Sequence, residues 1–175
     1  VPAFVILTLA WTISGVCREL LSTGEYVGSL VERSNIPVMF LPCIIFIVAG
    51  FLAFAMGTSW GTFGILIPIV AMVCQRVAPE LTIIALSATL AGAVFGDHCS
   101  PISDTTILSS TGAGCNHMDH VSTQIPYACL VAGVSFVGYI VAGLTTNLFI
   151  TLSVSLALLL VSIIVLHRCS LKKIM

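Results

Sequence analysis

The chain has 175 residues, of which 58% are hydrophobic and only 7% are charged, and its mean hydropathy is +1.17. Soluble domains usually carry about a quarter of their residues as charged side chains, so this composition excludes an ordinary water-soluble protein and predicts a chain embedded in a bilayer. The net charge of −1 offers no basic surface for nucleic acid. The sequence also has no P-loop lysine and no recognisable nucleophile–base pair, which argues against an enzyme.

The first predicted membrane segment covers residues 1–17, and a polar stretch of mixed charged and apolar residues follows it. Such a mixture is typical of an amphipathic segment at the membrane surface. Alternatively, Arg18 and Glu19 form an ion pair inside the bundle, because a buried charge needs a partner. The chain opens on Val1 directly in an apolar run. We therefore expect the C-terminal half of a longer transporter, since many transporters are built from two inverted repeats.

The second predicted segment covers residues 38–75, within a run that contains no charged residue. Its centre, AMGTSWGTFG, interrupts the apolar pattern with glycines and hydroxyl residues, so we predict a buried, non-helical break near residues 57–62 with Gly57 and Gly61 as break residues. The segment is then either a re-entrant hairpin or one long discontinuous pass. The simpler alternative is that these small residues only let helices approach closely.

The third predicted segment covers residues 81–114 and is broken near residues 97–105. Gly96 and Pro101 are the predicted break residues, because proline removes a backbone donor and disfavours a continued helix. Asp104 is well placed as the N-cap of a short helix that follows. We interpret the polar residues after this helix, which include His117, Asp119 and His120, as a solvated linker; the motif HMDH gives only a weak metal-binding signal.

The last two predicted segments, residues 125–147 and 148–166, are single apolar helices. Arg168, Lys172 and Lys173 follow them, and the positive-inside rule places such residues in the cytoplasm. The linker around Asp119 is then cytoplasmic too, if each helix crosses once. Together the segments predict one all-α integral membrane domain over residues 1–175, a helical bundle with broken helices or a re-entrant hairpin.

The polar residues at the two breaks are the candidate ion ligands. A carboxylate at membrane depth costs roughly 2.5 to 3.5 kcal/mol, and no Lys or Arg lies between Arg76 and Arg168 to pair with Asp97 and Asp104. Something positive must therefore lie beside them: a proton, a metal ion or a basic group elsewhere in the chain. Burial and a second carboxylate nearby both favour binding of a proton or a metal cation, and hard cations such as Na⁺ prefer oxygen ligands. We therefore predict a shared Na⁺ and proton site whose candidate ligands are Asp97, Asp104, Ser100, Ser103, Thr105, Thr106, Thr58 and Ser59.

Some residues of this set have more than one possible role. Asp97 is the stronger candidate because it directly follows a long apolar arm, whereas Asp104 has a competing role as a helix cap. His98 could relay protons, or it could be a neutral hydrogen-bonding residue. A half-helix that begins near Thr62 could hold an organic carboxylate at its N-terminus instead of a cation.

The strings GTSWGTFGILIPI and GAVFGDHCSPISDTTILSSTGAGCNHMDHVSTQIPYA, with LAWTISGVCRELLSTGEYV, resemble the NhaC family of Na⁺/H⁺ antiporters over roughly residues 9–141. The resemblance implies a multi-pass inner-membrane exchanger of Na⁺ for H⁺ that needs no cofactor beyond the transported ions. Relatives that exchange malate and lactate make organic-anion exchange the alternative function. The expected partners are the lipid bilayer, the N-terminal half of the transporter and a second copy in a homodimer. Without the N-terminal half the chain could be inactive.

Overall fold

The structure is a computed structural model that describes residues 37–174, with a few isolated positions before them and side chains as far as Arg168. The predicted segment at residues 1–17, the amphipathic stretch after it and the proposed pair of Arg18 and Glu19 lie outside the described residues. Within residues 37–174 every regular element is a helix. The predicted all-α class is confirmed.

Six α-helices form the described part of the chain, and two of them begin with a short 3₁₀ turn. Five helices, with their 3₁₀ turns included, are long and apolar enough to cross a membrane, and only α6 is too short. The elements are η1 (Val38–Phe40), α3 (Leu41–Met56), α4 (Ser59–Val77), η2 (Pro79–Leu81), α5 (Thr82–Cys99), α6 (Asp104–Ala113), α7 (His117–Thr145) and α8 (Leu148–Ile174).

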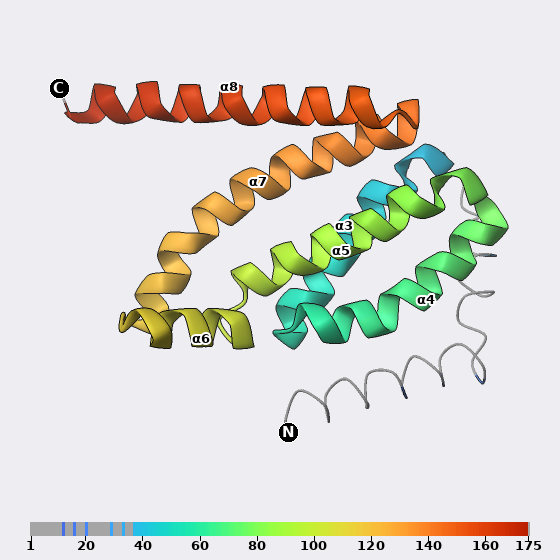
Figure 1. Ribbon diagram of the computed structural model, residues 1–175, viewed down its shortest axis with the longest axis horizontal. Coiled ribbons are helices and arrows are strands. Elements are labelled where there is room, and N and C mark those ends of the chain that lie inside the picture. Colours follow the sequence, from blue (N-terminus) through green and yellow to red (C-terminus); the bar gives the residue numbers. More distant parts are fainter. Residues whose placement is uncertain are drawn as a thin grey trace.

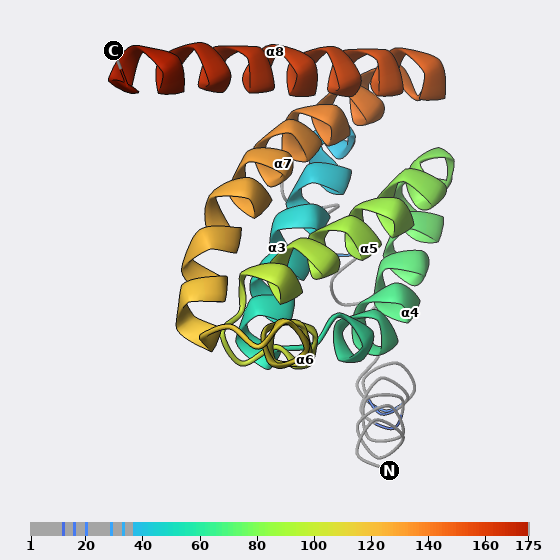
Figure 2. The ribbon, with the colours of Figure 1, turned by 60° about the vertical axis from the view of Figure 1, so that its left-hand side comes forward.

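Successive long helices run in alternating directions (Figure 1). The turn between α3 and α4 lies at the same end of the bundle as the connection between α5 and α6, and the short α6 lies across that end (Figure 2). Helix α8 turns back from the far end of α7 and diverges from it along its length (Figure 1). The two predicted breaks are therefore at one end of the described bundle.

The first break is a tight turn between two antiparallel helices. Gly57 adopts the left-handed conformation (φ 65°, ψ 29°) that ends α3, and the Thr58 side chain caps α4 by accepting a hydrogen bond from the Gly61 backbone. The segment is thus a helical hairpin, and the single discontinuous pass is wrong. The predicted non-helical stretch was also too long, because residues 59–62, including Gly61, form the first turn of α4.

The second break covers only residues 100–103. The wider limits that we predicted are wrong, because α5 continues through Asp97 to Cys99 and α6 begins at Asp104. Gly96 is therefore a helical residue and not a break residue, whereas Pro101 does lie in the connection. Proline can neither donate a backbone hydrogen bond nor follow a residue in helical conformation easily, which is consistent with the end of α5 at this point.

The predicted polar linker is also mostly helical. Asn116 caps α7 by accepting hydrogen bonds from the Met118 and Asp119 backbone amides, so His117 and His120 lie in the first turns of a 29-residue helix. Helix α7 therefore begins eight residues before the predicted segment at residues 125–147. The last helix is likewise longer than predicted and continues to Ile174.

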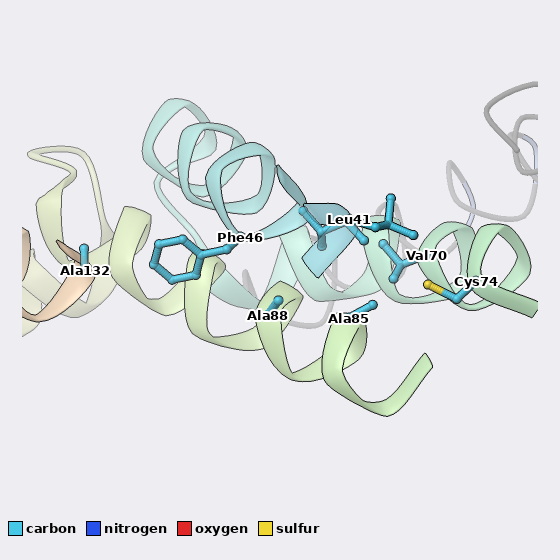
Figure 3. Packing of buried hydrophobic residues seen from close by; sticks show 8 residues of the cluster. Leu41, Phe46, Val70, Cys74, Ala85, Ala88 and Ala132 are labelled. Atoms are coloured by element: carbon cyan, nitrogen blue, oxygen red, sulfur yellow. The ribbon is translucent and has the colours of Figure 1, made fainter. Parts of the chain in front are cut away.

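Small residues hold α3 against α5. A Cβ added to Gly92 would collide with the backbone oxygen of Phe46, and one added to Gly96 would collide with that of Gly50. Phe46, which is 1% exposed, lies in a buried cluster with Ala88 and Ala132 (Figure 3). Its ring centroid lies 6.0 Å from that of Phe95 on α5 and 5.5 Å from that of Tyr139 on α7. This close packing fixes the last turn of α5, which carries Asp97, directly against α3.

Candidate ion-binding site

The two breaks contact each other. A Cβ added to Gly57 would lie 2.8 Å from both the Cγ1 and the carbonyl oxygen of Ile102, so the turn between α3 and α4 packs against the connection between α5 and α6. Both breaks are at the bundle end that α6 covers (Figure 2). Polar groups that are more than forty residues apart in the sequence are therefore brought to one region.

Asp97 is the centre of a buried polar cluster. It lies in the last turn of α5 and is only 2% exposed. The Ser103 hydroxyl donates to its Oδ1 at 2.7 Å, and the Thr105 hydroxyl lies 3.0 Å from its Oδ2. The two hydroxyl oxygens are themselves 2.7 Å apart. We call Asp97, Ser103 and Thr105 the Asp97 cluster.

The number of hydrogens that this cluster can place in its oxygen–oxygen contacts depends on the protonation of Asp97. Its three oxygen–oxygen contacts each need one hydrogen, but serine and threonine hydroxyls supply one apiece. An ionised Asp97 supplies none, so one contact then joins two oxygens without a hydrogen between them. A protonated Asp97 supplies the third hydrogen and satisfies all three contacts at once. The three contacts therefore leave a place for one further hydrogen in the cluster.

Two more buried hydroxyls of the break region have no hydrogen-bond partner among the described residues. The Ser100 Oγ and Thr106 Oγ1 atoms are buried, and neither bonds to any described residue. Buried polar groups normally have a partner, and leaving one unsatisfied costs about 1–3 kcal/mol. Ser100 and Thr106 therefore leave two buried hydroxyl oxygens without a partner among the described residues, in the same break region as the Asp97 cluster.

Asp104 lies outside this cluster. It is exposed, and its Oδ1 accepts a hydrogen bond from the Thr105 amide at 2.8 Å. The prediction that Asp104 caps α6 is wrong: Ser103, one residue earlier, has the extended backbone of an N-cap and accepts from the Thr106 amide. Asp104 is the first residue of the helix, where a negative charge favourably meets the helix dipole.

Thr58 and Ser59 lie at the neighbouring turn. The Thr58 hydroxyl serves as the cap of α4, and its carbonyl accepts the Thr62 hydroxyl at 2.9 Å. Ser59 is buried in the first turn of α4. Within residues 37–174 no hydrogen bond connects either residue to the Asp97 cluster, so the structure brings the two turns together but leaves these hydroxyls outside the cluster.

His98 points away from the cluster. It is exposed and lines a cavity of about 580 Å³ between α5 and α7. Its Nδ1 lies 2.8 Å from the Val94 carbonyl oxygen, and because a carbonyl only accepts, Nδ1 carries the hydrogen. This bond fits the interpretation of His98 as a hydrogen-bonding residue.

His117 is the site residue that sequence analysis missed. Its Nε2 lies 2.7 Å from the Pro101 carbonyl oxygen and its Nδ1 lies 3.1 Å from the Ser110 hydroxyl. The histidine thus contacts the connection between α5 and α6 directly. Asn116 was the available signal, because asparagine favours the N-cap position and would have placed His117 in a helix. No group of three His, Cys, Asp or Glu residues within the described part of the chain could hold a metal ion.

Comparison with known proteins identifies the family. The model of a Na⁺/H⁺ antiporter family matches residues 1–144. The chain belongs to this Na⁺/H⁺ antiporter family. No solved structure matches the chain.

Curated relatives of this antiporter chain are much longer than the chain itself. An uncharacterised protein of Haemophilus influenzae is 57% identical over 82% of the chain and 27% of its own length. An uncharacterised Na⁺/H⁺ antiporter of the same organism is 32% identical over 71% of the chain and 29% of its own length. The malate-2H⁺/Na⁺-lactate antiporter of Bacillus subtilis is 30% identical over 61% of the chain and 25% of its own length. The chain thus spans little more than a quarter of the relatives that it matches.

The glycine at the first break gives a testable prediction. Gly57→Leu should abolish transport, because its backbone is left-handed and its Cβ would meet the Ile102 carbonyl oxygen, at a cost of roughly 1–3 kcal/mol or more. Gly61→Leu should be milder, since the nearest atoms are the ends of the Thr58 and Met56 side chains. Ion-flux assays at matched membrane expression compare the two. Equal activity of both variants and the parent would show that the contact between the breaks is unimportant.

Proposed function

We propose that the chain is part of a transporter that exchanges Na⁺ for H⁺ across the cytoplasmic membrane, with Asp97 as the carboxylate that binds both ions in turn. Membership of the Na⁺/H⁺ antiporter family supports the reaction. The observation that carries the site is the hydrogen count of the Asp97 cluster. Ionised Asp97 leaves three short oxygen contacts with two hydrogens, so the cluster favours binding one proton or one cation.

The exchange follows from this competition. With a proton on Asp97, the carboxyl group and the Ser103 and Thr105 hydroxyls hydrogen-bond to one another. When Na⁺ binds, the proton leaves, and both hydroxyls rotate so that their oxygen lone pairs face the ion. Ser100 and Thr106 add hydroxyl oxygens that have no competing protein partner within residues 37–174. Because one carboxylate serves both ions, they cannot bind together, and this exclusion couples their opposite movements.

Asp104 has a secondary place in this proposal. Its exposed carboxylate is connected to the cluster through Thr105, whose amide bonds to Asp104 and whose hydroxyl bonds to Asp97. We propose that Asp104 raises the local concentration of cations at the entrance instead of holding the ion. Exposed charges act in this way over distances of several ångströms, and their effect is screened by salt.

The rest of the transporter must complete the pathway. The exposed surfaces of the long helices are largely apolar, as lipid-facing or protein-covered surfaces are. Since the chain spans little more than a quarter of its relatives, we propose that the remaining part supplies the other wall of the ion path. The exchange of two cations requires no resident cofactor.

Organic-anion exchange is the second candidate. The Bacillus subtilis relative is named for malate and lactate as well as Na⁺ and H⁺, and α4 begins beside the second break, where its N-terminus could face a carboxylate. The lack of Lys and Arg from residue 77 to residue 167 argues against an anion at this site. Proton flux driven by sodium malate or lactate, compared with NaCl at equal Na⁺ concentration, separates the two functions.

Substitution of Asp97 tests the proposed function. Asp97→Asn keeps the shape of the side chain but cannot release a proton for a cation, so Na⁺-driven proton movement in everted vesicles should vanish. Asp97→Glu should keep part of the activity with a different pH profile, because the carboxylate survives at an altered position. Asp104→Ser is the matched control for a nearby exposed carboxylate, and it should retain exchange with a weaker response to Na⁺ at low salt.

Two outcomes would contradict this proposal. If Asp97→Asn exchanges Na⁺ for H⁺ at the parental rate in well-expressed protein, then the coupling carboxylate lies elsewhere. If Asp104→Ser is as inactive as Asp97→Asn, then the exposed carboxylate is a ligand and our division of roles fails.

We also propose an orientation in which the chain end after α8 faces the cytoplasm. Arg168, Lys172 and Lys173 support it through the positive-inside rule. Helices α7 and α8 are each long enough to cross once, so the start of α7 would face the cytoplasm as well. The break region and the Asp97 cluster lie at the same end of the bundle as the start of α7 (Figure 2).

Cysteine labelling tests this orientation. In a background without native cysteines, Met118→Cys, at a position that is 60% exposed, should react with an impermeant reagent in everted vesicles but not in intact cells. Thr146→Cys, between α7 and α8, is the matched control and should show the opposite pattern. Efficient labelling of Met118→Cys from outside the cell would reverse the proposed orientation.

A further inference from the structure

His117 connects the start of α7 to the second break. Its Nε2 lies 2.7 Å from the Pro101 carbonyl oxygen, sixteen residues away. Because a carbonyl oxygen only accepts hydrogen bonds, Nε2 must carry the hydrogen and donate it. This bond ties α7 to the connection between α5 and α6.

The His117 Nε2–H group can donate to Pro101 whether the imidazole ring is neutral or protonated. The Nδ1 atom of His117 faces the Ser110 hydroxyl, which can also donate to the Ile107 carbonyl oxygen. That carbonyl accepts the Thr111 hydroxyl as well, so Ser110 is free to turn its hydrogen toward a neutral Nδ1 or to accept from a protonated one. The bond from Nε2 to Pro101 is therefore present in both forms of the ring.

The connection that His117 holds carries ligands of the proposed ion site. Pro101 follows Ser100, whose buried hydroxyl has no partner among the described residues, and it is two residues before Ser103, which donates to Asp97. The connection has few backbone bonds of its own, from the Ser100 amide to the Asp97 carbonyl at 3.1 Å and from the Ser103 amide to the Ser100 carbonyl at 3.3 Å. Gly57 contacts the connection at Ile102 from the other break.

We propose that His117 is a positioning residue of the ion site: by donating from Nε2 to the Pro101 carbonyl, it fixes residues 100–103 so that the Ser103 hydroxyl stays beside Asp97 and the Ser100 hydroxyl keeps its buried position. The role rests on the proposed function, because it concerns the affinity of that same site. It requires a hydrogen-bond donor at the position of Nε2 and does not require a charge. His117 itself touches no member of the Asp97 cluster through a hydrogen bond, so it acts through the connection.

Two amide substitutions separate the donor from the rest of the side chain. His117→Asn places its amide near the position of Nδ1 and keeps the partner Ser110, but it is too short to reach Pro101. His117→Gln places its amide nitrogen near the position of Nε2 and can donate to Pro101. His120→Asn, at a partly buried position one turn further along α7, is the matched control.

Exchange assays on the full-length protein in proteoliposomes give the first readout. His117→Asn should raise the Na⁺ concentration for half-maximal exchange about tenfold, the effect of losing roughly one hydrogen bond, while the maximal rate changes less. His117→Gln should restore the parental value with an unchanged pH profile, and His120→Asn should behave like the parent. A parental Na⁺ dependence in His117→Asn would overturn the proposal. So would a shifted pH profile in His117→Gln, because it would mean that the imidazole acts through its own titration.

Hydrogen–deuterium exchange gives a second readout that does not depend on transport. In His117→Asn the peptide that covers residues 100–107 should exchange faster than in the parent, and His117→Gln should restore its protection. Equal protection in all variants would overturn the positioning role even if the exchange activity were as proposed. Conversely, loss of protection in His117→Asn would show that His117 holds the connection even if Asp97→Asn showed that the coupling carboxylate, and with it the proposed function, lies elsewhere.

Discussion

The structure depends on how a single carboxyl group is accommodated away from solvent. Asp97 is 2% exposed, and two hydroxyl oxygens lie within hydrogen-bond distance of it and of each other. A buried ionised carboxylate with no basic partner is expensive, and two hydroxyl hydrogens do not satisfy three oxygen contacts. We propose that this deficit is the physical reason why the cluster takes up a proton or a small hard cation, and that it is the basis of exchange.

The rest of the fold holds the three residues of the Asp97 cluster together. The glycines of α5 let its backbone contact that of α3, and Asp97 in the last turn of α5 is 2% exposed. Proline and the Ser103 cap end one helix and begin the next within four residues, which brings hydroxyls from α6 back to the carboxylate. Gly57 and His117 hold the connection from two other elements. These contacts hold the backbone around Asp97 in place while the hydroxyl groups can reorient, as the proposed site for two different ions in turn would require.

Much of this was predictable, because isolated polarity in an apolar sequence is a strong signal. Asp97, Ser100 and Ser103 were recognised as candidates because a carboxylate and hydroxyls interrupt the apolar sequence there, and Gly57 marked a turn. The extent of each break was not predictable: small polar residues such as Ser59 and Gly61 fit the first turn of a helix as well as a loop. The cap of α6 was assigned to Asp104 instead of Ser103, because serine and aspartate are equally good N-caps. His117 was missed because its partner Pro101 is distant in sequence, and only the tertiary structure brings the two together.

The most direct test of the account is whether Na⁺ displaces a proton from Asp97. Infrared difference spectra of the purified full-length protein, recorded with and without Na⁺, report the carbonyl stretch of protonated carboxyl groups. Addition of Na⁺ should remove such a band and produce carboxylate bands in the parent, and this change should be absent in Asp97→Asn. No loss of a protonated carboxyl band in the parent, or the same loss in Asp97→Asn, would contradict the account.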